Sequence, residues 1–485
     1  MASTIKVNNI QNQCGANIAN KCGSTITLGA SGDTITLACG ASQTGFGRTG
    51  TVDWDTTAKT ASFTAVSGNG YFVNTTSGVI TVTLPATPSP GDIVAVADYA
   101  GTAATNTITI ARNGSNFEGG TENGGITTNR QTATFVYVDG TQGWIVVNSN
   151  DASFQLPTYI SATGGTETTC GNYKIHTFTG PGTFCVSSVG NPLGSTTVDY
   201  MVVAGGGGGG AGSSGSIYSG AGGGAGGYRE SSGVASGCYT TSPLGACVSA
   251  LPVTAQGYPI TVGAGGSGAT AATSSSPNAK NGSDGSNTIF STITSTGGGV
   301  GGTRHTSPAG PSITVSKGYP GGSGGGSTEG ITGGYLGGCG NTPPVSPPQG
   351  NNGGNASPGD CVPFTNISGG GGAIAVGGQG PCTTSSSPGG AGGAGATTLI
   401  SGSPTAYAGG GGAGGVSDSG AGGTGGTGGG GTGGTAAGGA GVPGNAGTTN
   451  TGGGGGGSSG RTGCSSGGNG GAGGSGIVII RYKYQ

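Results

Sequence analysis

The chain has 485 residues, of which 123 are glycine, about a quarter of the total against roughly 7% in ordinary proteins. Charged residues make up only 6% and the formal net charge is -2, which excludes strong electrostatic attraction to nucleic acid or anionic lipid. Collagen is excluded because it needs glycine at every third position over long runs and proline at roughly 15–20% or more, whereas the chain has 23 prolines. Hydrophobic residues make up 31% and charge is scarce, so composition alone does not predict disorder.

No targeting or membrane segment is evident in the sequence. Residues 1–6 lack the apolar core of a secretion signal, and no stretch approaches the roughly 20 apolar residues that span a bilayer. We therefore expect synthesis in a cytoplasm, without export by the common route and without membrane insertion.

The chain has 11 cysteines, an odd number, so at least one has no partner within the chain. No Cys-x-x-Cys pair occurs, which argues against a zinc ribbon or a thioredoxin-like motif, and we expect no metal site. Cys238 and Cys247 bracket a short loop and are the first candidates for a local disulfide; Cys170 and Cys185 are the second. The alternative is that most of the cysteines are small buried apolar residues.

Residues 1–50 contain a short repeat and are predicted to form a β-shaft or attachment segment. Ile26-Thr27-Leu28-Gly29 recurs nine residues later as Ile35-Thr36-Leu37-Ala38. Such β-branched pieces, joined by Gly/Asp turns, indicate stacked β-coils. A single coil cannot bury its own apolar face, so three chains wound together are expected. An ordinary hairpin is the alternative.

Residues 51–157 are predicted to form a compact β-sandwich or barrel domain. Short segments rich in Val, Ile, Thr and aromatic residues alternate there with turn signals such as Asn113-Gly114 and Asp139-Gly140. The predicted strands are residues 60–66, 70–74, 79–84, 93–98, 107–112, 133–138 and 144–147.

Residues 158–485 are predicted to form a small β-sandwich that carries the glycine-rich body. The region opens with an expected hairpin, in which residues 173–178 and 183–186 flank Gly180-Pro181-Gly182. Further strands are expected at residues 199–204, 260–262, 288–294 and 477–482. Glycine runs lie between them, chiefly at residues 205–227, 263–268, 297–302, 321–338, 369–378, 389–395, 409–441 and 452–475.

The glycine runs are predicted to fold as a polyglycine II lattice. Ordering glycine has a high entropy cost, so disorder is the default unless something offsets it. A helix with three residues per turn has no internal hydrogen bonds, and without side chains such helices can approach closely and bond laterally. Gly-Gly-x triplets at 467–475 and 422–427 fit this packing, because two positions in three face neighbours and the third faces outward.

Several motifs together resemble the glycine-rich domain of bacteriophage tail fibres and tail-tip adhesins. They are Asp199-Tyr200-Met201-Val202-Val203-Ala204 leading into a glycine run, residues 173–178 with Gly182-Thr183-Phe184, and the terminal residues 476–482. Residues 51–150, with Val52-Asp53-Trp54-Asp55 and residues 141–146, are similar to a segment of marine-phage tail fibres. The resemblance covers nearly the whole chain, although the chain adds a shaft-like amino-terminal region to the tip-only pattern.

The resemblance implies a receptor-binding tail fibre located in the virion. Its implied partners are copies of itself in a homotrimer, other tail or baseplate proteins, and a bacterial surface glycan or outer-membrane protein. Loops on the glycine scaffold would contact the receptor, and Tyr, Phe, Arg and His in such loops supply contact area and hydrogen bonds. The candidate receptor-binding residues are Tyr218, Tyr239, Arg304, His305, Tyr319, Tyr335, Phe364 and Tyr407. Each could instead cap the lattice or pack on a neighbour.

No enzymatic activity and no cofactor are expected. Residues 456–460 match a nucleophile elbow, but that motif needs a strand-to-helix turn with His and acid partners, and the chain has only two histidines. The few acidic residues after residue 158 form no evident glycosidase pair. The alternatives to a tail fibre are an extracellular filament subunit and an ice-binding polyglycine protein.

Overall fold

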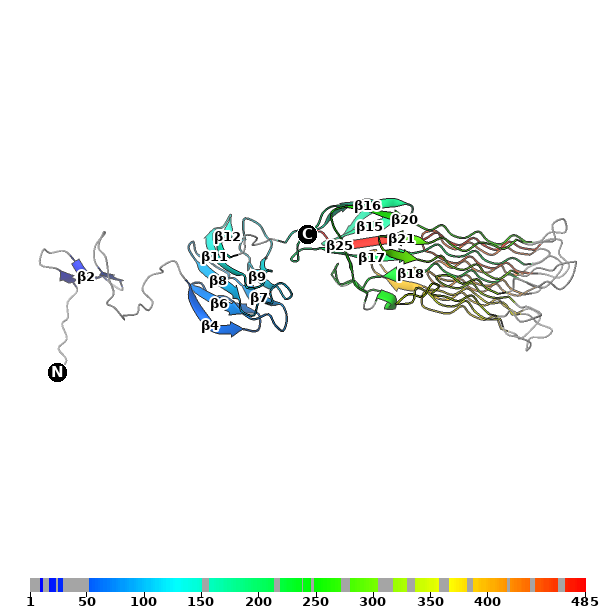
Figure 1. Ribbon diagram of the computed structural model, residues 1–485, viewed down its shortest axis with the longest axis horizontal. Coiled ribbons are helices and arrows are strands. Elements are labelled where there is room, and N and C mark those ends of the chain that lie inside the picture. Colours follow the sequence, from blue (N-terminus) through cyan, green and yellow to red (C-terminus); the bar gives the residue numbers. More distant parts are fainter. Residues whose placement is uncertain are drawn as a thin grey trace.

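The computed structural model is built almost entirely from β-strands and extended glycine runs (Figure 1), which confirms the all-β prediction. Its one helical element among the described residues is the short 3-10 helix η1 (Pro243–Gly245). No helix in the described part is long and apolar enough to cross a bilayer. The structure describes residues 9–11, 17–22, 25–28, 52–150, 157–212, 219–237, 239–245, 248–271, 280–303, 317–328, 336–356, 366–381, 387–416, 419–436, 441–460 and 467–485.

The amino-terminal segment contains a small antiparallel sheet of β1 (Asn9–Gln11), β2 (Asn17–Cys22) and β3 (Thr25–Leu28). The first copy of the repeat lies in β3, where Ile26 is opposite Lys21. The second copy, residues 35–38, lies outside the described residues. Stacked coils wound from three chains therefore stay a prediction.

Residues 52–150 form a two-layer sandwich and not a barrel. In both sheets the first strands of the domain pair in parallel, and the later strands complete the sheets with antiparallel pairs. The core between the sheets includes Phe117, Phe135 and Trp144. The larger sheet has the order β12 (Gly143–Ser149), β11 (Thr132–Asp139), β8 (Ile93–Asp98), β6 (Asn69–Val73), β4 (Asp53–Lys59), and the smaller one β10 (Gly124–Ile126), β9 (Ile108–Ala111), β7 (Ile80–Thr83), β5 (Phe63–Thr64).

The carboxy-terminal region contains a second sandwich, from which the glycine runs extend (Figure 1). Aromatic side chains that include Phe184, Phe290 and Tyr482 fill the space between its two sheets. One sheet has the order β13 (Ser161–Thr163), β16 (Gly182–Ser188), β20 (Gly257–Thr261), β21 (Thr288–Phe290), β22 (Ile293–Ser295), and the other β14 (Thr166–Cys170), β15 (Tyr173–Phe178), β25 (Ile477–Lys483), β17 (Thr197–Val203), β18 (Tyr228–Glu230), with β19 (Leu251–Pro252) beside β17.

The central strands of the second sheet are buried on both faces. Met201, Val203 and Ile479 face a separate cluster that includes Ala396 and Ile400 and lies against the hairpin of β23 (Ala396–Thr398) and β24 (Thr405–Tyr407). Burial on both faces explains why β17 and β25 are nearly continuous apolar runs in the sequence.

Two strand predictions in this sandwich are wrong. Residues 173–178 and 183–186 do not form a hairpin, because β15 pairs with β14 and β25 whereas β16 pairs with β13 and β20. The turn between them crosses from one sheet to the other, which lets Phe178 and Phe184 both reach the aromatic core. The strand predicted at 288–294 is a hairpin of β21 and β22 that turns at Ser291, whose φ is +54°.

The glycine runs bond laterally with a period of three residues, as a polyglycine II lattice requires. Gly206 and Gly209 donate their N–H groups to the C=O groups of Gly474 and Gly471 at 2.9 and 2.8 Å. In the central run, residues 205–212, the N–H groups of residues 205–210 are divided among three neighbouring runs, at 219–227, 280–286 and 467–475. Its C=O groups accept from three more, at 263–271, 297–303 and 452–460.

The outer runs confirm the predicted role of the Gly-Gly-x triplets. In residues 420–427 the third positions, Ala421, Thr424 and Thr427, are exposed, and the glycines between them are buried or half-buried. The central run has no such positions, and all of its residues are buried. Side chains are thus kept on the outside, where they do not separate the backbones.

Close backbone approach is what makes glycine necessary at inner positions. A Cβ added at Gly209 would lie 2.0 Å from the carbonyl oxygen of Gly456, far inside van der Waals contact. Gly180, in the turn between the two sheets, has no atom within 4 Å of the same added Cβ.

We predict that Gly209→Ala destabilises the glycine-rich domain by about 1–3 kcal/mol, because the methyl group must push two paired runs apart. Gly180→Ala makes the same chemical change in open space and is expected to stay within about 0.5 kcal/mol of the wild type. Scanning calorimetry of the three proteins measures the difference. Equal unfolding temperatures for Gly209→Ala and Gly180→Ala would contradict close lateral packing.

Candidate functional site

The far end of the lattice is the end opposite the sandwich, and it is defined by how the strands continue into the runs. β17 leads directly into residues 204–212, and residues 219–227 return to β18 (Figure 1). β20 leads into residues 263–271, and residues 280–287 return to β21. The described runs on both sides of residues 213–218 and 272–279 therefore end at the far end.

Hydroxyl side chains fix the run ends at the far end. Ser219 donates its Oγ–H to the carbonyl of Gly415 at 2.7 Å, and its Oγ accepts from the N–H of Gly460 at 2.7 Å. Ser458 Oγ accepts the N–H of Gly212 at 2.6 Å. These residues are fully buried, so the ends of several runs are tied to one another.

Small apolar clusters fill the remaining space near the far end. One consists of Ala221, Ile367, Ala413 and Val416, and the other of Ala211, Ala269 and Ala271. The change from glycine to Ala, Ser, Thr or Val at run ends is a sequence signal that could have located the far end. The result is a fixed array of run ends, from which the connecting segments start.

Five of the eight candidate receptor-binding residues lie outside the described residues: Tyr218, Arg304, His305, Tyr335 and Phe364. Tyr218 directly precedes Ser219, and Arg304 directly follows Thr303, so both adjoin far-end run ends. Their proposed role in receptor binding stays a prediction.

The other three candidates do not form a shared surface, because two of them pack in one buried cluster and the third lies in the lattice. Tyr407 is 5% exposed and packs in the cluster beneath the second sheet, so the prediction of a surface contact at this residue is corrected. The ring of Tyr239 packs in the same cluster, and burial raises the pKa of its hydroxyl. Tyr319 is 37% exposed, and its N–H bonds to Val300 within the lattice. Local sequence showed none of these differences, because burial here depends on strands far apart in the chain.

The second disulfide candidate is also corrected. Cys170 and Cys185 are both free thiols, because Cys170 ends β14 in one sheet whereas Cys185 is an exposed residue of β16 in the other. The first pair, Cys238 and Cys247, lies outside the described residues.

Two buried carboxylates near the sandwich hold the segment after β18. Asp199 accepts hydrogen bonds from Ser231 Oγ at 2.7 Å, from the N–H of Gly233 at 3.1 Å, and from both the N–H and Oγ of Ser236 at 2.7 and 2.5 Å. Glu230 accepts from Tyr228 Oη at 2.7 Å, from the N–H of Ser242 at 3.0 Å and from Thr398 Oγ1.

The surroundings of these two carboxylates indicate a structural role. Burial raises the pKa of Glu230, and Asp199 is fully buried. Arg481, opposite Asp199 on β25, is itself buried and stacks its guanidinium 4.8 Å from the ring centre of Tyr173 and 5.1 Å from that of Tyr239. No group of three or more metal-ligating side chains that could hold a metal ion occurs among the residues that the structure describes.

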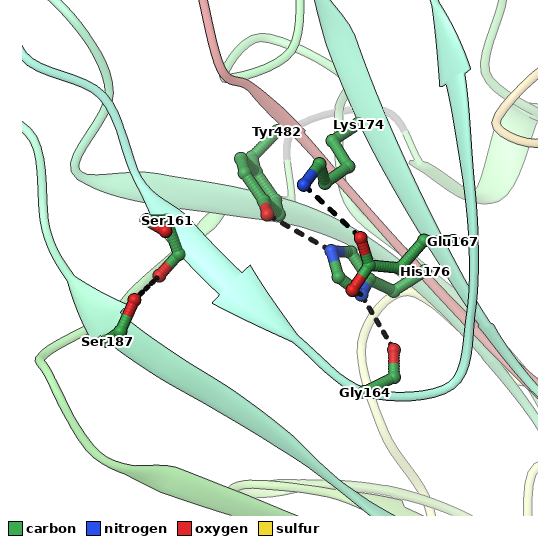
Figure 2. A network of polar contacts seen from close by, with 7 residues as sticks. All are labelled: Ser161, Gly164, Glu167, Lys174, His176, Ser187 and Tyr482. Carbon is green, nitrogen blue, oxygen red and sulfur yellow. Dashed lines mark hydrogen bonds and ion pairs between the residues drawn. The ribbon is translucent and has the colours of Figure 1, made fainter.

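A third buried polar group lies between the sheets of the carboxy-terminal sandwich (Figure 2). His176 is fully buried; its Nδ1 is 2.7 Å from the carbonyl oxygen of Gly164 and its Nε2 is 3.0 Å from Tyr482 Oη. A neutral ring with the proton on Nδ1 satisfies both contacts. Glu167 lies 3.9 Å from Nδ1 and pairs with Lys174 at 3.2 Å. Desolvation dominates over these contacts and lowers the pKa of His176.

The profile of a family described as a glycine-rich domain matches residues 179–483. This match covers more than half of the 485 residues, so the chain belongs to that family. The matched segment begins at the turn before β16 and ends with β25, and thus contains the whole lattice. No curated protein matches the chain.

We predict that protonation of His176 weakens the carboxy-terminal sandwich. Its pKa in the folded state lies below the ordinary value of 6.5, so the unfolded state binds the proton more readily. The stabilisation is complete above 6.5 and is lost as the pH falls below that value toward the folded-state pKa. Unfolding temperatures measured from about pH 8 to about pH 5 should fall more steeply for the wild type than for His176→Gln, which cannot titrate. Parallel curves for the two proteins would contradict the assignment.

Proposed function

We propose that the chain is the receptor-binding tail fibre protein of a bacteriophage and attaches the virion non-covalently to the surface of a bacterial host. The observation that carries the proposal is the array of run ends at the far end of the lattice, tied together by buried hydroxyl groups such as those of Ser219 and Ser458. A fixed array holds several connecting segments side by side, as a recognition surface requires.

The composition of the segments supports recognition there. The lattice exposes mainly small residues on its flanks, for example Ala421 and Thr424, which offer few distinctive contacts. Tyr218, Arg304, His305, Tyr335 and Phe364 lie in segments between the described runs. Aromatic residues and arginine are the types most enriched at binding hot spots.

The amino-terminal part fits attachment to the rest of a virion. In the proposed fibre, residues 1–50 and the sandwich at 52–150 connect the glycine-rich domain to other tail or baseplate proteins. A homotrimer would present three far ends and raise a weak affinity per site through avidity. The partner on the host is a surface glycan or an outer-membrane protein.

An ice-binding role is a second candidate, favoured by the regular rows of small outward residues on the outer runs, such as Ala421, Thr424 and Thr427. In that case the flank of the lattice, and not its far end, would be the working surface. Thermal hysteresis in a solution of the purified chain would support it. Long filaments formed by the pure chain under the electron microscope would instead support a filament subunit.

We predict that the fluorescently labelled full-length chain binds cells of particular strains in a panel of bacteria and blocks adsorption of phage that grow on them. Combining Arg304→Ala with His305→Ala, or making Tyr335→Ala, should weaken binding by roughly 10-fold or more if these residues are hot spots. Tyr99→Ala is the matched control, because Tyr99 is 52% exposed in the sandwich at 52–150. The proposal fails if no strain is bound, or if the control loses as much binding as the far-end variants.

A further inference from the structure

The two outer faces of the sandwich at 52–150 differ in chemistry. On the smaller sheet the residues that point away from the core are mostly threonines, such as Thr81, Thr83 and Thr109, because Val82, Ile108 and Ile110 fill the inward positions. A threonine-rich outer face is usual for a sheet in contact with water.

The outer face of the larger sheet is apolar, and we call it the apolar face. Its residues form cross-strand rows: Ile145, Val136 and Ile93 in one, and Ala97 with Phe72 in another. Between them runs a row with Thr134, Ala95 and Gly70, and at its end lies Trp54. None of these positions carries a charge. Ile93, Ala95 and Ala97 are covered by their neighbours, and the accessible apolar part of the face consists of Trp54, Phe72, Val136 and Ile145.

Trp54 lies flat across this face. A Cβ on Gly70 would be 2.7 Å from the Trp54 ring, so glycine is what lets the indole rest on the sheet. The ring stacks beside Phe72 at 4.9 Å between centroids and is still 39% exposed. Val138 and Val147, at the edge of the same sheet, are 45% and 56% exposed.

We propose that the apolar face is the contact surface between copies of this chain. That several copies assemble symmetrically is part of the proposed fibre function, on which this inference rests. The inference adds the surface through which the copies meet. Copies arranged around a three-fold axis can each turn this face toward the axis and bury it against their neighbours without any charge pairing, as closed cyclic homo-oligomers do.

The edge strand of the larger sheet is unsuited to pairing with another chain, which leaves the apolar face as the contact surface. β4 has one neighbour, β6, so its other side offers open N–H and C=O groups. The edge carries Asp53, Asp55 and Lys59, and Asp55 pairs with Lys59 at 2.7 Å. Charges on an edge strand oppose pairing with another chain, whereas the apolar face has no such protection.

The path of the chain favours a second copy over an unrelated partner. Val52, the first described residue of the domain, also packs over Gly70, so the chain enters the domain across the apolar face. Copies that meet at this face bring their amino-terminal segments together. The sheet of β1, β2 and β3 has strands of only three, six and four residues, too little to bury a core alone, and neighbouring copies would supply the missing surface.

The test uses the full-length chain, whose mass is 44.9 kDa. Light scattering over a roughly 100-fold concentration range should show a multiple of this mass for the wild type. Val136→Glu places a charge in the middle of the apolar face and is expected to give the mass of one chain. Thr83→Glu, on the outer face of the smaller sheet, is the matched control and should assemble like the wild type.

Tryptophan fluorescence provides a second readout that needs no substitution. The chain has two tryptophans; Trp144 is fully buried and Trp54 is exposed, so quenching by acrylamide reports on Trp54. Quenching should be weaker for assembled chains than for single chains, and should stay constant for Val136→Glu. The emission of Trp144 reports whether that variant is folded.

Three results would overturn the inference: a wild type with the mass of one chain at every concentration, a folded Val136→Glu that assembles normally, or quenching of Trp54 that is the same in single and assembled chains. The last result would mean that Trp54 lies outside the contact between copies. Adsorption to cells is measured separately. A chain that binds cells but has the mass of one chain in solution would therefore refute this contact without contradicting the proposed function.

Discussion

The lateral hydrogen bond between glycine backbones is the interaction on which the carboxy-terminal half depends. An ordered glycine loses more conformational freedom than any other residue, and a helix of this type has no bonds of its own to offset that loss. Each net bond contributes only about 1 kcal/mol, so the runs must bond on many sides at once. The central run does so, with three neighbours for its donors and three for its acceptors. Removing side chains is the condition that makes such contact geometrically possible.

A lattice of nearly identical runs has little in itself to set its register. Any run could slide by one triplet and recover most of its bonds, which is the weakness of glycine-rich strands in general. The sandwich removes this freedom, because β17 and β25 pair from Asp199 opposite Arg481 to Val203 opposite Ile477. β17 leads into a glycine run and β25 directly follows one, so this pairing sets the register of both runs. Buried apolar side chains on both faces of these strands allow one register. The hydroxyl contacts of Ser219 and Ser458 then fix the other end.

The strands with strong local patterns were predictable from the sequence, and their partners were not. β15 was predicted with its observed bounds, and β8 likewise. β4, with Asp, Thr and Lys, and β10, with two glycines, were missed because they are strands only through their neighbours. The false hairpin of β15 and β16 has the same origin: a Gly-Pro-Gly turn allows either a hairpin or a crossing between sheets, and the aromatic core decides. The burial of a candidate residue was unpredictable for the same reason: Tyr407 is buried by contacts with β17 and β25, which lie far from it in the chain.

The distribution of charge separates the scaffold from the proposed recognition surface. Asp199, Glu230, Arg481 and His176 are all buried at the sandwich end. Hydrogen bonds satisfy the carboxylates and the imidazole, and the guanidinium of Arg481 stacks on two tyrosine rings. The described far-end contacts, in contrast, are made by uncharged groups: hydroxyls, the side-chain amide of Asn469, backbone groups and apolar side chains. A change of protonation or a substitution at these buried residues is therefore expected to change the stability of the glycine-rich domain. It is expected to affect the far end only when the domain unfolds. Conversely, no charged side chain takes part in the far-end contacts described above, so substitutions in the segments between run ends are expected to leave the buried charges undisturbed.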